Sequence, residues 1–247
     1  MLPSVRARAL ALFAMSFGLA PLRAQQPSAQ ERQRAADEQM RTDWANLRRY
    51  RAANDSLGAP APGEQRVVFM GNSITDGWAR YFPAMFPGKP YIGRGIGGQT
   101  TPQMLVRFRQ DVIALKPAVV VILAGTNDIA GNTGPSSVEM IEDNLASMTE
   151  LAKANGIGVV LSSVLPVYDY PWRPGLEPVP KIAALNDWMK SYATRVGAVY
   201  LDYYSAMVDA RRGLRSDLTS DGVHPTEDGY RVMAPLAERA IQEVLHR

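Results

Sequence analysis

The sequence predicts an α/β fold in which a parallel sheet is covered by helices on both faces. After residue 63, five short apolar runs alternate with longer segments of helical periodicity. Short strands that alternate with helices favour a parallel sheet, because each crossover helix then packs on one face. The predicted strands cover residues 66–70, 89–92, 118–124, 158–162 and 198–201.

The segments between and after these strands have the spacing of amphipathic helices. Apolar side chains recur every three or four residues, which is the period of one helix face. The run AVVVILA at 118–124 is the clearest strand, and Asn155-Gly156 ends the helix that precedes the fourth strand. The predicted helices cover residues 102–115, 138–154, 180–196 and 226–245.

Composition excludes several classes of site. The 247 residues contain no cysteine and two histidines, His224 and His246. Thiol nucleophiles, cysteine-bound zinc and iron–sulfur clusters are therefore excluded, and we expect neither a metal site nor a cofactor. Residues 61–247 carry 18 basic and 19 acidic side chains, so the body is neutral and has no basic footprint for nucleic acid.

The amino terminus has the pattern of a secretory signal peptide over residues 1–24. Arg6 and Arg8 precede an apolar run over 9–20, and a small residue, Ala24, stands at the expected cleavage site. The alternative is an uncleaved membrane anchor, but 12 apolar residues are short for a bilayer. A lipoprotein anchor would need a cysteine. We therefore expect a periplasmic or secreted protein that is not inserted in a membrane after removal of the signal.

Residues 25–63 are predicted to form a helical extension and a linker ahead of a catalytic domain at 64–247. Met40, Trp44 and Leu47 share one face of a predicted helix over 30–53, and a segment rich in Gly and Pro follows at 57–63. The alternative is a membrane-surface helix. Because its apolar face is thin and acidic residues interrupt its positive charge, we expect this helix to pack on the body.

Four loops rich in glycine and small polar residues are expected at one edge of the sheet. In open parallel sheets, ligands bind beyond the carboxyl ends of the strands, where the strand order reverses. Three loops follow strands and the fourth precedes the last helix: GNSITDGW (71–78), GRGIGGQTT (93–101), AGTNDIAGN (124–132) and SDGVHP (220–225).

These loops carry the groups that acyl transfer requires. Ser73 follows the first strand, and His224 lies three residues after Asp221, a spacing that lets the carboxylate orient the imidazole. Gly98 can offer its backbone N–H and Asn127 its amide to an oxyanion. Taken singly, each residue is better explained by a helix cap or a turn. Together, at one sheet edge, they predict an esterase-like site.

The four loops resemble the four sequence blocks of the SGNH/GDSL hydrolases over residues 64–245. The resemblance implies a flavodoxin-like three-layer α/β/α sandwich with five parallel strands. It also implies that Ser73 is the nucleophile, that Asp221 and His224 complete the triad, and that Ser73, Gly98 and Asn127 form the oxyanion hole. Two positions depart from the usual blocks: Asn72 replaces the aspartate before the serine, and Gly93 replaces the asparagine that often opens the second block.

The sequence is also compatible with two other functions, dinucleotide binding and carbohydrate binding without catalysis. Residues 93–98 match the dinucleotide motif G-x-G-x-x-G, but they follow the second strand and lack the acidic partner. A carbohydrate-binding protein on an esterase fold would use loop aromatics, of which Trp78, Tyr168 and Trp172 are the candidate substrate contacts, with Tyr170 beside them.

We predict an exported serine esterase that acts on a short-chain, acetyl ester of a carbohydrate. The predicted export signal and the aromatic loop YDYPW at 168–172 favour this substrate class. A lysophospholipase, a thioesterase or an arylesterase of the same family is the alternative. The sequence does not predict the oligomeric state.

Overall fold

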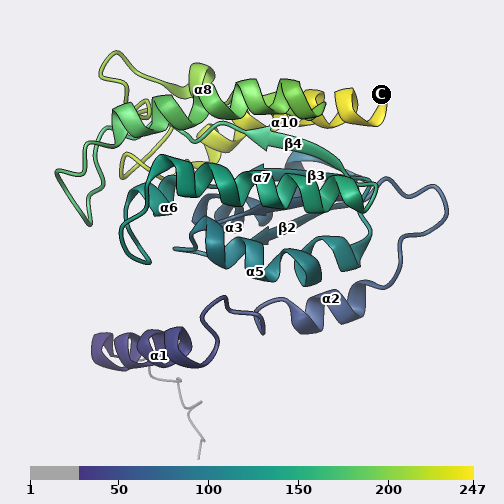
Figure 1. The fold of residues 1–247 in the computed structure, drawn as a ribbon, viewed down its shortest axis with the longest axis horizontal. Helices are drawn as coiled ribbons and strands as arrows, with labels where there is room; N and C mark the ends of the chain where they lie inside the picture. Colours follow the sequence, from purple (N-terminus) through teal and green to yellow (C-terminus); the bar gives the residue numbers. More distant parts are fainter. Residues whose placement is uncertain (1–27) are drawn as a thin grey trace, which may run out of the picture. The chain divides into compact units, whose positions relative to one another are not determined.

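The computed structural model describes residues 28–247 (Figure 1). The predicted signal peptide at 1–24 lies outside the described residues. Residues 39–247 form one compact unit, and a separate unit ends at Glu38. No helix within residues 28–247 is long and apolar enough to cross a membrane.

A five-stranded parallel sheet forms the centre of the compact unit, in the order β2-β1-β3-β4-β5. This order reverses direction between β1 and β3, as in flavodoxin-like folds, and a ligand site is expected at that point. Gly71, the last residue of β1, pairs with Gly95 of β2 and Leu123 of β3. The strands are β1 (Val67–Gly71), β2 (Tyr91–Gly95), β3 (Val119–Leu123), β4 (Gly158–Ser162) and β5 (Val199–Leu201).

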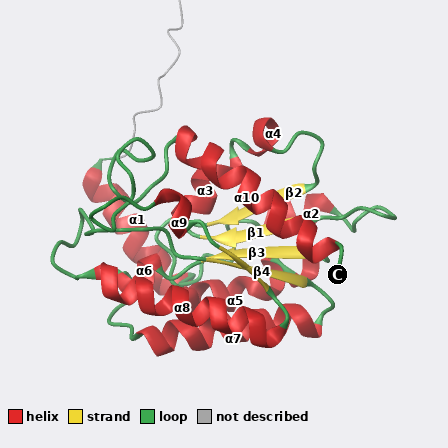
Figure 2. Cartoon of the chain, turned by 90° about the horizontal axis from the view of Figure 1, so that it is seen from above, coloured by secondary structure: helices red, strands yellow, loops and turns green. Residues whose placement is uncertain are grey.

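Helices cover both faces of the sheet, which confirms the predicted three layers (Figure 2). Alternate residues of β1, β3 and β4 enter two separate cores. In β1, Val68 faces one core, and Val67 and Phe69 face the other. The first core is closed by α5 (Thr101–Asp111), α7 (Val138–Ala154) and α8 (Pro178–Val196), and the second by α3 (Ser73–Ala79) and α10 (Glu227–Leu245).

Short helical elements complete the unit. They are α4 (Phe82–Met85), η1 (Ile113–Leu115), α6 (Thr126–Ile129) and α9 (Tyr204–Met207). The prediction of one helix over 102–115 is therefore corrected, because α5 ends at Asp111 and a separate 3-10 turn follows. Predicted helix 138–154 and strand 158–162 agree with the structure at both ends.

The prediction of a continuous helix over 30–53 is wrong. The segment folds as α1 (Ala29–Thr42) and α2 (Arg51–Leu57), with turns between them. The Asp43 carboxylate accepts hydrogen bonds from the backbone N–H groups of Leu47 and Arg48, and Asn46 has a left-handed φ of 53°. A side chain that bonds nearby backbone groups competes with helix formation, so the helix stops here.

Strand β2 extends to Gly95, three residues beyond the predicted end. A Cβ atom on Gly95 would lie 2.1 Å from the backbone nitrogen of Asp76, and one on Gly93 would lie 2.5 Å from the Ala79 Cβ. These two glycines therefore let α3 lie directly on β2. Close helix–strand packing explains the first glycines of the G-x-G-x-x-G match without a dinucleotide.

Candidate active site

Ser73 is the first residue of α3, directly beyond the carboxyl end of β1, as the sequence predicts. Asn72 caps this helix: its side-chain oxygen accepts a hydrogen bond of 3.3 Å from the Ile74 N–H. The approach is tight, because a Cβ on Gly71 would lie 2.0 Å from the Thr75 Oγ1. A glycine at the strand end thus permits the sharp transition from strand to helix that exposes the serine.

The structure brings Ser73, His224 and Asp221 into one hydrogen-bonded chain. Ser73 Oγ lies 2.9 Å from His224 Nε2, and His224 Nδ1 lies 2.7 Å from Asp221 Oδ2. Ser73 and His224 are 151 residues apart in sequence. Their meeting confirms the expectation that loops 71–78 and 220–225 share one edge of the sheet.

A local turn presets the orientation of the histidine. Asp221 Oδ1 accepts hydrogen bonds from the backbone N–H groups of Val223 (2.9 Å) and His224 (2.8 Å), while Oδ2 faces the ring. The Thr219 hydroxyl donates to the His224 carbonyl at 2.7 Å. Backbone and ring of His224 are therefore both fixed by residues within five positions along the chain.

The Asp221 carboxylate is stabilised in its charged form. Partial burial opposes ionisation, but the hydrogen bonds from the His224 backbone and ring and from the Val223 N–H outweigh it and lower the pKa of Asp221 to about 2. The carboxylate is thus ionised at every pH at which a histidine base would work. Such an acceptor fixes the ring tautomer and stabilises an imidazolium.

The loop after β2 runs beside the serine. A Cβ on Gly97 would lie 3.9 Å from the Ser73 Cβ, which places this backbone in contact with the nucleophile candidate. Gly98 has a φ of +75°, a conformation that favours glycine. Its carbonyl accepts a hydrogen bond of 3.1 Å from Asn132 Nδ2. This bond ties the loop after β2 to the loop after β3.

Asn127 lies 3% exposed at the start of α6 and also joins these loops. Its Nδ2 donates to the Gln99 carbonyl at 2.9 Å, which leaves the second amide hydrogen for another acceptor. Next to it, the buried Asp128 accepts hydrogen bonds from the Thr101 N–H and hydroxyl. Burial raises the pKa of Asp128 to about 6 despite these bonds.

Sequence reasoning did not find Gln99, Thr101 or Asp128. Each lies within or next to a block that was singled out, and each is almost fully buried. A polar residue that follows a glycine-rich loop is the signal that could have found them. The sequence alone does not reveal the hydrogen-bond partner of each of these side chains.

The three aromatic candidates have different environments. Trp78 is 1% exposed and stacks on Tyr230 in the core at a ring separation of 5.5 Å, so its selection as a substrate contact is corrected. Tyr168 is 53% exposed and lies under the Arg211 guanidinium at 4.3 Å. Trp172 is 43% exposed, and its ring centre lies 6.1 Å from that of His224.

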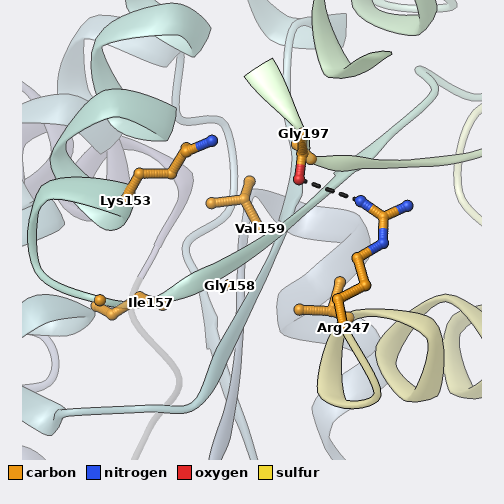
Figure 3. A pocket seen from close by; sticks show the side chains of 9 residues that line it. Lys153, Ile157, Gly158, Val159, Gly197 and Arg247 are labelled. Carbon is orange, nitrogen blue, oxygen red and sulfur yellow. Dashed lines mark hydrogen bonds between the residues drawn. The ribbon is translucent and has the colours of Figure 1, made fainter. Parts of the chain in front are cut away.

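A cleft of about 270 Å³ lies at the amino-terminal end of β4 (Figure 3). Arg247 donates to the Gly197 carbonyl at 3.1 Å and Lys153 to the Val196 carbonyl. These cations satisfy the last carbonyls of α8, so helix capping explains them. Within residues 28–247, no three side chains of the types that bind metals are grouped to hold an ion.

The match to a family model identifies the chain as a hydrolase with a flavodoxin-like sheet. Residues 69–232 match the model of the GDSL-like lipase/acylhydrolase family, and the chain belongs to this family. A structure from Bacteroides fragilis that is assigned to the acylhydrolases is 51% identical, with a TM-score of 0.80 over 83% of this chain and 99% of that one.

The chain is also similar to curated proteins, one of which is named an esterase. An acetylxylan esterase of Geobacillus stearothermophilus is 26% identical over 204 residues, which cover 69% of this chain and 90% of the relative. A Bacillus subtilis protein, the uncharacterized lipoprotein YqeF, is 25% identical over 218 residues, or 72% of this chain and 90% of the relative. The protein is a carboxylic ester hydrolase.

The lowered pKa of Asp221 predicts a pH-dependent stability. A carboxyl group whose pKa is lowered from 3.8 to about 2 stabilises the fold above pH 4, and this contribution is lost as the pH falls toward 2. We expect Asp221→Asn to lower the free energy of unfolding at pH 6 and to have a clearly smaller effect at pH 2.5, where part of the contribution of the carboxylate is already lost. Urea unfolding at both pH values measures this, and an equal difference at both would contradict it.

Proposed function

We propose that the protein is an exported serine esterase that hydrolyses short-chain, acetyl esters of carbohydrates. Ser73 is the nucleophile, His224 the general base and acid, and Asp221 the group that orients His224. The observation that carries this proposal is the hydrogen-bonded chain from Ser73 Oγ through both ring nitrogens of His224 to Asp221. Nucleophile, base and orienting carboxylate are the parts that acyl transfer requires.

Acylation begins when His224 Nε2 takes the proton of Ser73 Oγ as this oxygen bonds to the ester carbon. The carbonyl oxygen becomes an oxyanion, which the N–H groups of Ser73 and Gly98 and the Asn127 amide stabilise. The bond to the alcohol oxygen then breaks. His224 gives its proton to that oxygen, so a neutral alcohol leaves and the acyl group stays on Ser73.

Deacylation repeats these steps with water. His224 takes a proton from the water, whose oxygen attacks the acyl carbon, and the same three donors stabilise the second oxyanion. The bond to Ser73 Oγ breaks and His224 returns the proton to it. The free acid and the unchanged enzyme result, and no cofactor takes part.

A carbohydrate acetyl ester is the substrate class that the surroundings of His224 favour. The exposed ring of Trp172 lies beside the imidazole and rests on the buried Tyr170 at 5.3 Å. An exposed aromatic ring beside the proposed catalytic histidine is suited to stack on a sugar. The relative in Geobacillus stearothermophilus is named an acetylxylan esterase.

The alternatives within the ester hydrolases are a lysophospholipase, a thioesterase or an arylesterase. A series of p-nitrophenyl esters with increasing acyl length, followed by acetate release from acetylated xylan, separates them. Highest kcat/KM on acetyl esters and release of acetate support the carbohydrate assignment. A preference for long acyl chains would replace it with a lipid substrate.

The nucleophile assignment predicts that Ser73→Ala abolishes activity without loss of the fold. Removal of a triad member lowers kcat by about 10⁴-fold to 10⁶-fold. The matched control is Ser205→Ala: the Ser205 hydroxyl donates to Asp202 at 2.6 Å and has no histidine beside it. We expect this variant to keep full activity on p-nitrophenyl acetate. More than a tenth of wild-type activity in Ser73→Ala would exclude Ser73 as the nucleophile.

The oxyanion assignment predicts that Asn127→Ala lowers kcat and leaves KM nearly unchanged. The loss should be roughly 10²-fold to 10³-fold, because the donor acts on charge that develops only in the transition state. Asn155→Ala removes an amide that donates to Leu151 at the end of α7 and serves as the control. If Asn127→Ala kept more than a third of the wild-type kcat while its melting temperature fell, Asn127 would be a structural residue only.

Export predicts that the mature protein begins near Gln25. The support is the pattern of Arg6, Arg8 and the apolar run at 9–20, together with the lipoprotein name of the relative in Bacillus subtilis. The location would then be the periplasm or the medium. Amino-terminal sequencing of the protein from its native host measures the start, and an intact Met1 would exclude cleavage.

A further inference from the structure

Gln99 takes no part in the proposed chemical steps, but it contacts α5, the segment before α2 and the start of α6. It is 4% exposed and follows Gly98 directly. Its side-chain oxygen accepts a hydrogen bond of 2.5 Å from Arg107 Nε, and its side-chain nitrogen donates to the Ala45 carbonyl at 2.7 Å. Its backbone carbonyl accepts the Asn127 amide. Gln99 therefore connects the loop after β2 to Arg107 and to the segment around Ala45, and its backbone also bonds Asn127.

Arg107 connects Gln99 to the ends of the two strands that precede the proposed catalytic loops. Its side chain is fully buried, and its Nη2 donates at 2.9 Å to the carbonyls of both Gly71 and Arg94. Gly71 lies two residues before Ser73, and Arg94 lies four residues before Gly98. The positive charge of Arg107 is balanced by the Asp111 carboxylate, whose Oδ2 lies 3.0 Å from Arg107 Nη1.

On its other side, Gln99 is held by the chain between α1 and α2. Three glutamine side chains on or before α5 donate to three backbone carbonyls of this segment, each at 2.7 Å. They are Gln99 to Ala45, Gln103 to Trp44 and Gln110 to Leu47. Of these three, Gln99 is the one that also contacts Arg107 and Asn127. The amino-terminal segment is therefore anchored along α5, with one anchor at the oxyanion loop.

We propose that Gln99 is a positioning residue, which sets the Gly98 N–H and the Asn127 amide at the geometry that the oxyanion requires. The bonds to Arg107 and Ala45 fix residue 99, and residue 99 fixes its neighbour Gly98 and its hydrogen-bond partner Asn127. This inference rests on the proposed oxyanion hole. It adds that the segment around Ala45, far away in sequence, contributes to catalysis through Gln99.

The test compares Gln99→Met with Gln110→Met. Both variants lose a hydrogen bond to the amino-terminal segment. The other side-chain bond of Gln110 is a long one, 3.4 Å, to Asp111 Oδ1, whereas Gln99 bonds Arg107 and Asn127 directly. We expect Gln99→Met to lower kcat on p-nitrophenyl acetate by about 10-fold to 100-fold with little change in KM, because a misplaced oxyanion donor weakens only the transition state. Gln110→Met should keep kcat within about twofold while its melting temperature falls.

Gln99→Glu provides the second variant. A glutamate keeps the acceptor for Arg107 but places a carboxylate oxygen against the Ala45 carbonyl, so residue 99 is displaced and we expect a kcat below that of wild type. It alone decides the outcome if Gln99→Met does not fold. Affinity for an acetyl-like boronic acid, which forms a tetrahedral adduct, should fall in parallel with kcat, because this adduct needs the same donors.

The two levels of the proposal fail in different ways. If Ser73→Ala were active, the proposed catalytic set would fail and this inference would fail with it. If Ser73→Ala were inactive while folded Gln99 variants kept wild-type kcat and boronate affinity, only the role of Gln99 would be overturned. An equal loss of kcat in Gln99→Met and Gln110→Met would likewise show that both act through stability alone.

Discussion

The fully buried cation of Arg107 fixes the part of the sheet on which the active site depends. A guanidinium taken out of water needs an acceptor for each donor group, and removal of one partner of a buried pair costs about 3–5 kcal/mol. Arg107 meets this requirement with the carbonyls of Gly71 and Arg94 and the side chains of Gln99 and Asp111. The ends of β1 and β2 are therefore held at a fixed spacing, since movement of either would remove a hydrogen bond from the buried guanidinium.

Glycines allow the same region to be tight on the opposite face. Gly71, Gly93 and Gly95 leave no room for a Cβ atom against α3. The helix that begins with Ser73 consequently lies directly on the two strands that Arg107 holds from the other side. The packing of α3 and the hydrogen bonds of Arg107 thus both restrain the backbone at Gly71, two residues before Ser73. Core positions of this kind tolerate neither added volume nor lost partners.

The sequence predicts what depends on local pattern and on the edge rule for parallel sheets. Strand 158–162, helix 138–154 and the meeting of Ser73 with His224 follow from these signals alone. Tertiary contacts decide the rest. The break in the predicted helix at 43–50 begins with the local hydrogen bonds of Asp43, and carbonyls of this segment then bond glutamines 54 to 63 positions away. The burial of Trp78 depends on which face of α3 meets the sheet, and no local signal in the sequence marks that face.

The two halves of the proposed mechanism sit in different environments, and their chemistry explains why. The side chains of His224 and Asp221 are 37% and 40% exposed on a turn that is held by its own short-range hydrogen bonds. Deacylation requires a water molecule to reach His224, so an accessible base is an advantage in this loop. Asn127 and Gln99 are 3% and 4% exposed and are bonded to each other. Electrostatic stabilisation of an oxyanion gains from fixed dipoles in a region of low dielectric constant, because such dipoles need not reorganise as charge develops. The buried network around Arg107 supplies that rigidity on the oxyanion side and leaves the histidine loop free of it.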